Sequence, residues 1–316
     1  MQPIPLAEIE AARARIRYVA VRTPLVRLLV DSPAEIWLKL ELLQPVGAFK
    51  LRGAANAVLS TDPELVHDGL WTASAGNMAQ GVAWCARLLG VPCQVVVPEG
   101  APQTKLTATR RLGAEIVEVS VDEWFDVFTT RQHEAMKGLF VHAFADEAVM
   151  AGNGTVGLEL AEDLDAFDAV VIPFGGGGLA CGVASALRAL RPDVRVYAAE
   201  VDTGAPLAPS LEAGEPVRVE YQRSFVDGIG GPTVLPEMLE LSRELLYGSI
   251  VVGLDETADA VRLLAERARV VAEGAAGAGV AAALSGRAGE GRVVCIVSGG
   301  NIDLEVLARI LRGEKP

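Results

Sequence analysis

One lysine is well placed for covalent chemistry with a carbonyl group. Of the five lysines, only Lys50 lies in an apolar, glycine-flanked segment, Gly47–Ala54, at the start of an expected helix. Burial and the positive end of a helix would both lower the pKa of its amine, which would make the amine a better nucleophile. A lysine on a helix surface is the alternative interpretation. The neighbouring Arg52 is expected to be structural.

A glycine run joins an expected strand at 169–174 to an expected helix at 180–190. Backbone without Cβ atoms can approach a ligand closely, and N–H groups at a helix N-terminus favour a phosphate. The run has neither the GxGxxG spacing of a dinucleotide site nor the Lys-Ser/Thr of a P-loop. It therefore indicates a site for one compact phosphate, with tight helix packing as the alternative. Its residues are Gly175, Gly176, Gly177, Gly178 and Leu179.

Two more segments place polar side chains at the ends of expected strands. In the first, side-chain donors and the free N–H groups of the following helix could bind a carboxylate. The second begins with Ser298, which follows a strand at 293–297 and precedes two glycines and Asn301. Both have ordinary alternatives, as a helix cap and a turn. The first segment consists of Ser74, Ala75, Gly76, Asn77 and Met78.

Alternating strands and helices must position these segments. Apolar runs at 36–40, 93–97 and 194–200 are typical of strands, and helical patterns cover 78–89, 122–136 and 156–163. This alternation predicts an α/β fold of parallel sheets with right-handed crossovers. No change of composition marks a boundary along the chain. If the protein has two domains, one must therefore be inserted into the other.

The composition restricts the class of protein. The 316 residues are 51% hydrophobic and 22% charged, enough to form a packed core, and the net charge of −13 argues against nucleic-acid or anionic-membrane partners. We find no signal-peptide core and no apolar run of the ~20 residues that span a membrane. Single cysteines and three scattered histidines indicate reduced thiols and no metal site, so we expect a cytoplasmic enzyme. The cysteines are Cys85, Cys93, Cys181 and Cys295.

Taken together and in this order, the segments GAFKLRGA, SAGNMAQG, GGGGL and SGGNID resemble the four signature loops of the fold-type II pyridoxal-phosphate enzymes. The closest resemblance is to the threonine/serine dehydratase and serine racemase group. It covers nearly the whole chain and includes Asp227-Gly228 and the glycine/alanine run that contains Glu273. It implies a two-domain α/β fold like that of the tryptophan synthase β subunit. Residues 1–69 plus 144–316 would form a large cofactor-binding domain and 70–143 an inserted small domain.

The resemblance also implies the cofactor, pyridoxal 5′-phosphate, and a role for each segment. Lys50 matches the lysine that holds the cofactor covalently and moves the substrate Cα proton, with Phe49 packed beside the ring. Asn77 matches the donor to the 3′-oxygen, and Ser298 matches the partner of the pyridine nitrogen. The glycine run would hold the phosphate, and residues 74–78 the substrate carboxylate. A serine at the ring nitrogen keeps the pyridine largely uncharged, which favours expulsion of a β-leaving group.

Departures from the family pattern refine these expectations. Racemases carry a serine proton donor where this chain has Ala75. The family's divalent-cation site would use Glu200 with a partner at the position of Pro206, so no metal is expected. Met78 replaces a histidine and Phe125 an arginine, which favours an apolar β-substituent if both line the pocket. We also expect no regulatory domain after Ser298, and hence no feedback control by isoleucine through such a domain.

These observations predict a dehydratase (ammonia-lyase) that converts a β-hydroxy amino acid such as threonine or serine to a 2-oxo acid and ammonia. Alternatives within the family are β-replacement of the cysteine synthase type and amino-acid racemisation. The alternative outside the class is a non-catalytic protein that binds the cofactor or an amino acid, against which Lys50 argues. Since the family usually dimerises, a homodimer is expected.

Overall fold

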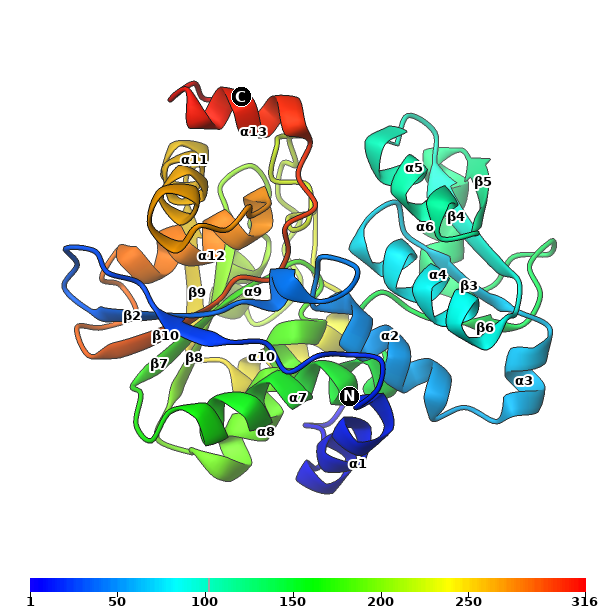
Figure 1. Ribbon diagram of the computed structural model, residues 1–316, viewed down its shortest axis with the longest axis horizontal. Coiled ribbons are helices and arrows are strands. Elements are labelled where there is room, and N and C mark those ends of the chain that lie inside the picture. Colours follow the sequence, from blue (N-terminus) through cyan, green and yellow to red (C-terminus); the bar gives the residue numbers. More distant parts are fainter. Residues whose placement is uncertain (102) are drawn as a thin grey trace.

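The computed structural model describes residues 1–101 and 103–316, and it is an α/β fold with two separate sheets, each flanked by helices (Figure 1). The six-stranded sheet has the order β1-β2-β10-β7-β8-β9 and is parallel except for the edge strand β1, which pairs antiparallel with β2. Its strands are β1 (Leu25–Arg27), β2 (Glu35–Lys39), β7 (Ala169–Pro173), β8 (Arg195–Val201), β9 (Gly248–Val252) and β10 (Arg292–Ile296).

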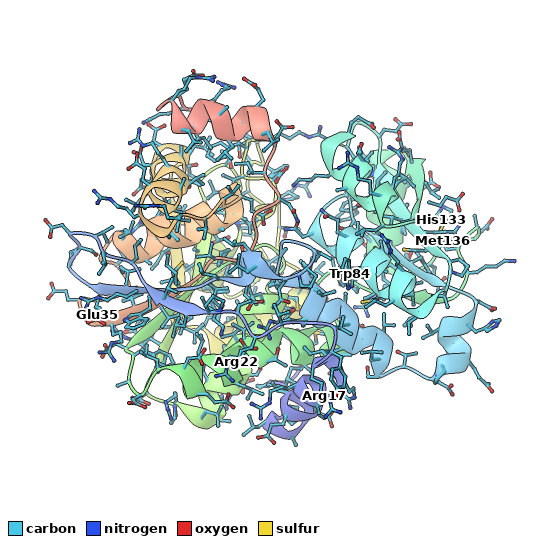
Figure 2. All side chains as sticks on the ribbon, in the orientation of Figure 1. Arg17, Arg22, Glu35, Trp84, His133 and Met136 are labelled. Atoms are coloured by element: carbon cyan, nitrogen blue, oxygen red, sulfur yellow. The ribbon has the colours of Figure 1, made fainter. Side chains whose placement is uncertain are left out.

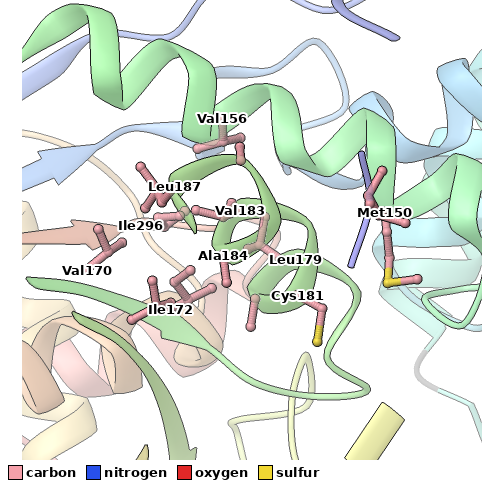
Figure 3. Close-up of a cluster of buried hydrophobic side chains, with 14 of the residues drawn as sticks. Met150, Val156, Val170, Ile172, Leu179, Cys181, Val183, Ala184, Leu187 and Ile296 are labelled. Atoms are coloured by element: carbon pink, nitrogen blue, oxygen red, sulfur yellow. The ribbon is translucent and has the colours of Figure 1, made fainter. Parts of the chain in front are cut away.

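Helices cover both faces of this sheet because its strands are apolar on both sides. Val170 and Ile172 of β7 point into a core with α1, α7, α8 and α10 (Figure 3), whereas Ala169 and Val171 point to the opposite core with α11 and α12. The elements outside the strands are α1 (Leu6–Ile16), η1 (Glu41–Leu43), α2 (Lys50–Leu59), α7 (Glu147–Asp163), α8 (Gly178–Leu190), α9 (Leu207–Ala213), α10 (Pro236–Leu245), α11 (Leu254–Leu263), the π-helix η2 (Leu264–Ala268), α12 (Gly274–Leu284) and α13 (Leu304–Leu311).

The four-stranded sheet has the order β5-β4-β3-β6 and is parallel throughout. Its strands all come from the segment that we expect to be an inserted small domain, which lies to the right in Figure 1. One face packs on α2, α4 and α5, and the other on α6. The helix α3 (Pro63–His67) leads into this part, whose elements are β3 (Leu70–Ala73), α4 (Asn77–Leu89), β4 (Cys93–Pro98), α5 (Gln103–Arg111), β5 (Glu115–Val119), α6 (Val121–Thr130) and β6 (Leu139–Phe140).

Two helix boundaries differ from the sequence prediction. The helix expected at 122–136 ends at Thr130, because Arg131 adopts a left-handed conformation (φ 61°) that terminates it. The helix expected at 156–163 begins nine residues earlier, at Glu147, where the side chain of Asp146 caps it by accepting a hydrogen bond from the N–H of Val149 (3.0 Å). The helix has glycines in this first half because neighbouring helices pack too closely there for a side chain. A Cβ at Gly152, for example, would lie 2.3 Å from a carbonyl oxygen of α2.

A buried ion network fixes α2 to the large sheet and to α7. Arg52 is 2% exposed and donates to both oxygens of Glu41 (2.7 and 2.8 Å) and both oxygens of Glu159 (2.7 and 3.0 Å). Lys39 pairs with Glu159 (2.6 Å) and donates to Asp163 (3.1 Å). Arg22, labelled in Figure 2, also pairs with Asp163 and extends the network to the surface. Arg52 is therefore structural, as its sequence context indicated.

Among the described residues, no helix is both long and apolar enough to cross a membrane.

Candidate active site

Lys50 is the first residue of α2, and the segment before it is held against the segment after β10. Ala48 and Gly299 form an isolated antiparallel bridge. The N–H of Phe49 donates to the carbonyl of Ser298 (3.0 Å), and the N–H of Gly300 donates to the carbonyl of Gly47 (2.9 Å). Two motifs separated by some 250 residues in sequence are thus adjacent in space.

The amine of Lys50 is held by a backbone carbonyl. Its Nζ donates to the carbonyl oxygen of Ala143 (2.6 Å) and lies 5.2 Å from the centre of the Phe49 ring. Burial lowers the pKa of Lys50 to about 8, although the nearby Glu273 carboxylate acts in the opposite direction. A substantial fraction of the amine is therefore neutral, and nucleophilic, at slightly alkaline pH.

The loop at 74–78 brings a polar side chain across from the small sheet. Gly76 precedes the first turn of α4 without a side-chain cap, and the hydroxyl of Ser74 accepts a hydrogen bond from the N–H of Gly76 (3.2 Å). Asn77 donates through Nδ2 to both oxygens of Glu273 (2.9 and 3.2 Å) and accepts through Oδ1 from Asn301 (2.9 Å). The uncapped N–H groups of α4 leave donors for an anion beside this loop.

Glu273 is a buried carboxyl at the start of α12 that contacts Asn77 at the start of α4. It is 3% exposed, and burial raises its pKa to about 7, partly opposed by the ammonium group of Lys105 and the hydrogen bond from Asn77. Lys105, on α5, forms an ion pair with Asp227 of the large part (2.5 Å). These contacts join the small and large parts of the molecule beside Lys50.

The glycine run forms the start of α8. Gly177 has φ 90°, which favours glycine, and α8 begins at Gly178 without a side-chain cap. A Cβ at Gly176 would lie 2.2 Å from the ring of Phe144, and one at Gly178 would lie 2.7 Å from the carbonyl oxygen of Phe144. Two of the glycines are therefore required by packing against Phe144, while the helix N-terminus keeps the N–H groups that a phosphate needs.

These contacts connect the four motifs to one another. Lys50 donates to the carbonyl of Ala143, and the next residue, Phe144, packs against the glycine run. Gly175, in the glycine run, lies beside Gly228, because a Cβ at Gly175 would be 3.5 Å from the carbonyl oxygen of Gly228. Gly228 in turn lies beside Glu273, because a Cβ at Gly228 would be 3.3 Å from its carboxylate. Glu273 then contacts Asn77 and the segment after β10. Lys50, the amide of Asn77, the backbone of Ser298 and the uncapped start of α8 are thus linked through these contacts.

Sequence reasoning missed His142 and the turn after it, which presents the backbone carbonyl that accepts the hydrogen bond from Lys50. His142 is 1% exposed, and burial lowers its pKa to about 3, so the imidazole is neutral. Its Nδ1 accepts hydrogen bonds from the N–H groups of Phe144 (3.2 Å) and Ala145 (2.8 Å), which fixes the turn that presents the Ala143 carbonyl. A lone histidine in an apolar stretch was the only signal of this role in the sequence. Asn301 was visible only as part of a turn.

Met78 and Phe125 would favour an apolar β-substituent only if both side chains lined the pocket. The side chain of Met78 is 1% exposed and packs in the core between α2 and the small sheet, because the first turn of α4 directs it inward. Phe125 is 49% exposed on α6. Neither side chain is therefore placed to select a substrate side chain in this structure.

Glu200 has partners within the protein. Its two oxygens accept hydrogen bonds from the N–H groups of Leu207 (2.8 Å) and Ala208 (2.9 Å) and from the hydroxyl of Ser249 (2.7 Å). The carboxylate thus caps α9. Among the described residues, no group of three or more His, Cys, Asp or Glu side chains is arranged to hold a metal ion.

Comparison with known proteins places this arrangement in a family. Residues 16–299 match the family described as "Pyridoxal-phosphate dependent enzyme". The chain is 40% identical to the L-threonine ammonia-lyase of Thermotoga maritima over 314 residues, which cover 98% of this chain and 78% of that protein.

Solved structures give the same result at the level of the fold. Maize serine racemase superposes with a TM-score of 0.89 and 31% identity, covering 98% of each chain. The processed form of threonine deaminase isoform 2 from Solanum lycopersicum superposes with a TM-score of 0.87 and 30% identity, covering 97% of this chain and 86% of that one.

Proposed function

The chain belongs to the fold-type II pyridoxal-phosphate-dependent enzymes, in the threonine dehydratase and serine racemase group, and from this premise we propose that it is a threonine ammonia-lyase. The proposed reaction removes the β-hydroxyl as water and the amino group as ammonia, and leaves a 2-oxo acid. The observation that carries the proposal is the position of Lys50, whose amine lies among the four motif segments with its pKa lowered to about 8.

The residues present fit pyridoxal phosphate by the chemistry of their donors and by the space that the glycines leave. Lys50 would hold the cofactor covalently, with Phe49 beside the ring. Asn77 would donate to the ring oxygen, and Ser298 would face the ring nitrogen. The N–H groups from Gly175 to Leu179 would bind the phosphate. When bound, the cofactor supplies the electron sink that allows a Cα proton to be removed and a β-substituent to leave.

Residues of this chain would perform the proton transfer and orient the substrate. The N–H groups and hydroxyl of the loop at 74–78 would bind the substrate carboxylate, which fixes the Cα–H bond relative to Lys50. A neutral Lys50 amine can then accept the Cα proton, and the lowered pKa keeps this form accessible near pH 8. The carbonyl of Ala143 accepts a hydrogen bond from this amine and so orients it.

Two other activities of the family have less support. Racemisation needs a proton donor on the side opposite Lys50, and the corresponding position is Ala75, which carries no transferable proton. Cysteine synthases have a threonine-rich asparagine loop and a less uniform phosphate loop than Gly175–Gly178. A non-catalytic binding protein would not need the lysine amine.

The test is direct. The purified protein is incubated with pyridoxal phosphate and, separately, with threonine, serine, phenylserine and hydroxyaspartate, and release of 2-oxo acid is measured. The proposal expects threonine to give the highest kcat/KM. Absence of 2-oxo acid from all four, with the cofactor bound, would exclude an ammonia-lyase.

We also propose a cytoplasmic homodimer, on the basis of the family alone. Light scattering coupled to size-exclusion chromatography of the holoprotein would give about twice the 33.2 kDa chain mass, and a mass of one chain would contradict the proposal.

A further inference from the structure

We propose that Glu273 and Asn301 are positioning residues that fix the side-chain amide of Asn77, so that one N–H of Asn77 is left to face the cofactor. This inference rests on the proposed function, because it assigns to Asn77 the hydrogen bond to the cofactor ring oxygen. It adds two residues, from the start of α12 and from the segment after β10, that do not themselves have to touch the cofactor.

The argument begins at a backbone carbonyl, which can only accept hydrogen bonds. The carbonyl of Val46 accepts from Nδ2 of Asn301 (2.9 Å), so the Asn301 amide must turn its nitrogen toward this group. The same Nδ2 donates to Oδ1 of Asn77 (2.9 Å). Both hydrogens of the Asn301 nitrogen are thus used, and the oxygen of the Asn77 amide must face Asn301.

Glu273 fixes the other end of the same amide. Above its pKa of about 7 the Glu273 carboxylate is ionised and only accepts hydrogen bonds, and both of its oxygens lie near Nδ2 of Asn77, at 2.9 and 3.2 Å. Because the two oxygens belong to one carboxylate, they lie on the same side of Nδ2, and we infer that they share one of its two hydrogens. The second Nδ2 hydrogen of Asn77 has no protein acceptor among these contacts. It is therefore the one donor that the Asn301–Asn77–Glu273 chain leaves for a ligand.

The backbone around Gly299 leaves room for the contact between Glu273 and Asn77. A Cβ at Gly299 would lie 2.3 Å from Oε1 of Glu273 and 3.2 Å from Nδ2 of Asn77, so only glycine allows the carboxylate to lie here. The N–H of Glu273 donates to the carbonyl of Gly299 (3.0 Å), which ties the start of α12 to the same segment as Asn301. The charged groups that act on Glu273 are Lys105, Asp227 and Lys50.

The experiment is a double-mutant cycle in which binding of pyridoxal phosphate to the apoprotein is titrated by absorbance. The single variants are Glu273→Gln, Asn301→Ala and Asn77→Ala, and each of the first two is also combined with Asn77→Ala. Glu200→Gln is the matched control, because Glu200 is another buried carboxyl whose oxygens accept hydrogen bonds but which does not contact Asn77. Thermal unfolding verifies that each variant folds, and Asn301→Ser replaces Asn301→Ala if the latter does not fold.

Each of Glu273→Gln and Asn301→Ala is expected to weaken binding about three- to tenfold, the usual range for one hydrogen bond, and to shift the absorbance maximum of the bound cofactor toward that of Asn77→Ala. In the Asn77→Ala background both effects should fall to within about twofold, while Glu200→Gln should leave affinity and spectrum unchanged. Full effects that persist without Asn77, or single variants that bind like wild type, would overturn the inference. Since the readout is binding, elimination activity tests the proposed function separately.

Discussion

Replacing Arg52 by methionine should destabilise the protein strongly and leave its chemistry nearly intact. Arg52 lies only two residues after Lys50 on α2, about half a helical turn, so its guanidinium points away from the site toward Glu41 and Glu159. Both carboxylates are nearly inaccessible, at 0% and 5% exposed. Burial alone would raise the pKa of Glu41. The charge and hydrogen bonds of Arg52, together with the hydrogen bond from Thr23 and the charge of Lys39, outweigh burial and hold this pKa below its usual value.

The expected loss of stability depends on the partners that Glu41 and Glu159 keep after Arg52 is replaced. Removing one partner from a buried ion network costs about 3–5 kcal/mol, because a charge is left without compensation. After Arg52→Met, Glu159 keeps Lys39 at 2.6 Å, while Glu41 keeps only neutral donors, among them Thr23 at 2.5 Å. One carboxylate is therefore left unpaired, and we expect the lower end of the range, about 3 kcal/mol.

Urea unfolding, followed by circular dichroism, measures this loss, and 2-oxo acid release at low temperature measures activity. Adding Glu41→Gln to Arg52→Met should recover part of the stability, because it removes the unpaired charge. kcat/KM should remain within about threefold of wild type. A loss of stability below about 1 kcal/mol, or a large loss of kcat in a stable variant, would refute the assignment of Arg52 as structural.

Three further predictions concern the site. Lys50→Ala should lower 2-oxo acid release at least ~10³-fold and abolish borohydride fixation of the cofactor, and fixation at another lysine would contradict the site. With one enantiomer of serine, little of the other should form, whereas Ala75→Ser should raise the ratio of racemisation to elimination; an unchanged ratio would contradict the role of this position. The folded pKa of Glu273, about 7, exceeds the usual 4.5, so its carboxyl costs stability as pH rises from 4.5 to 7 and in full above that range. The free energy of unfolding of Glu273→Gln should therefore exceed that of wild type by up to about 3 kcal/mol at pH 8 and by much less at pH 5. An equal increase at both pH values would contradict the shifted pKa.

The motifs could be recognised from the sequence because each depends on local chemistry. Gly175–Gly178 could be recognised because consecutive glycines at a strand-to-helix junction have few other uses, and Lys50 because charged residues are rare in apolar, glycine-flanked segments. Whether the side chain of Met78 lines the pocket or packs in the core could not be decided from the sequence, since a family position does not state which face of α4 packs inward. The end of α6 was also missed, because Arg131 adopts a left-handed conformation that no residue pattern required.

The sequence by itself determined the α/β alternation, the order of the four motifs and the lysine on which the proposed chemistry depends. Only the tertiary structure decided which groups surround that lysine. The carbonyl of Ala143, the ring of Phe144 and the contact between Asn77 and Glu273 join segments about 30 to 200 residues apart. Such partners carry no local signal, because a backbone carbonyl is available at every residue and a buried carboxyl acquires its raised pKa only when folding removes water from it.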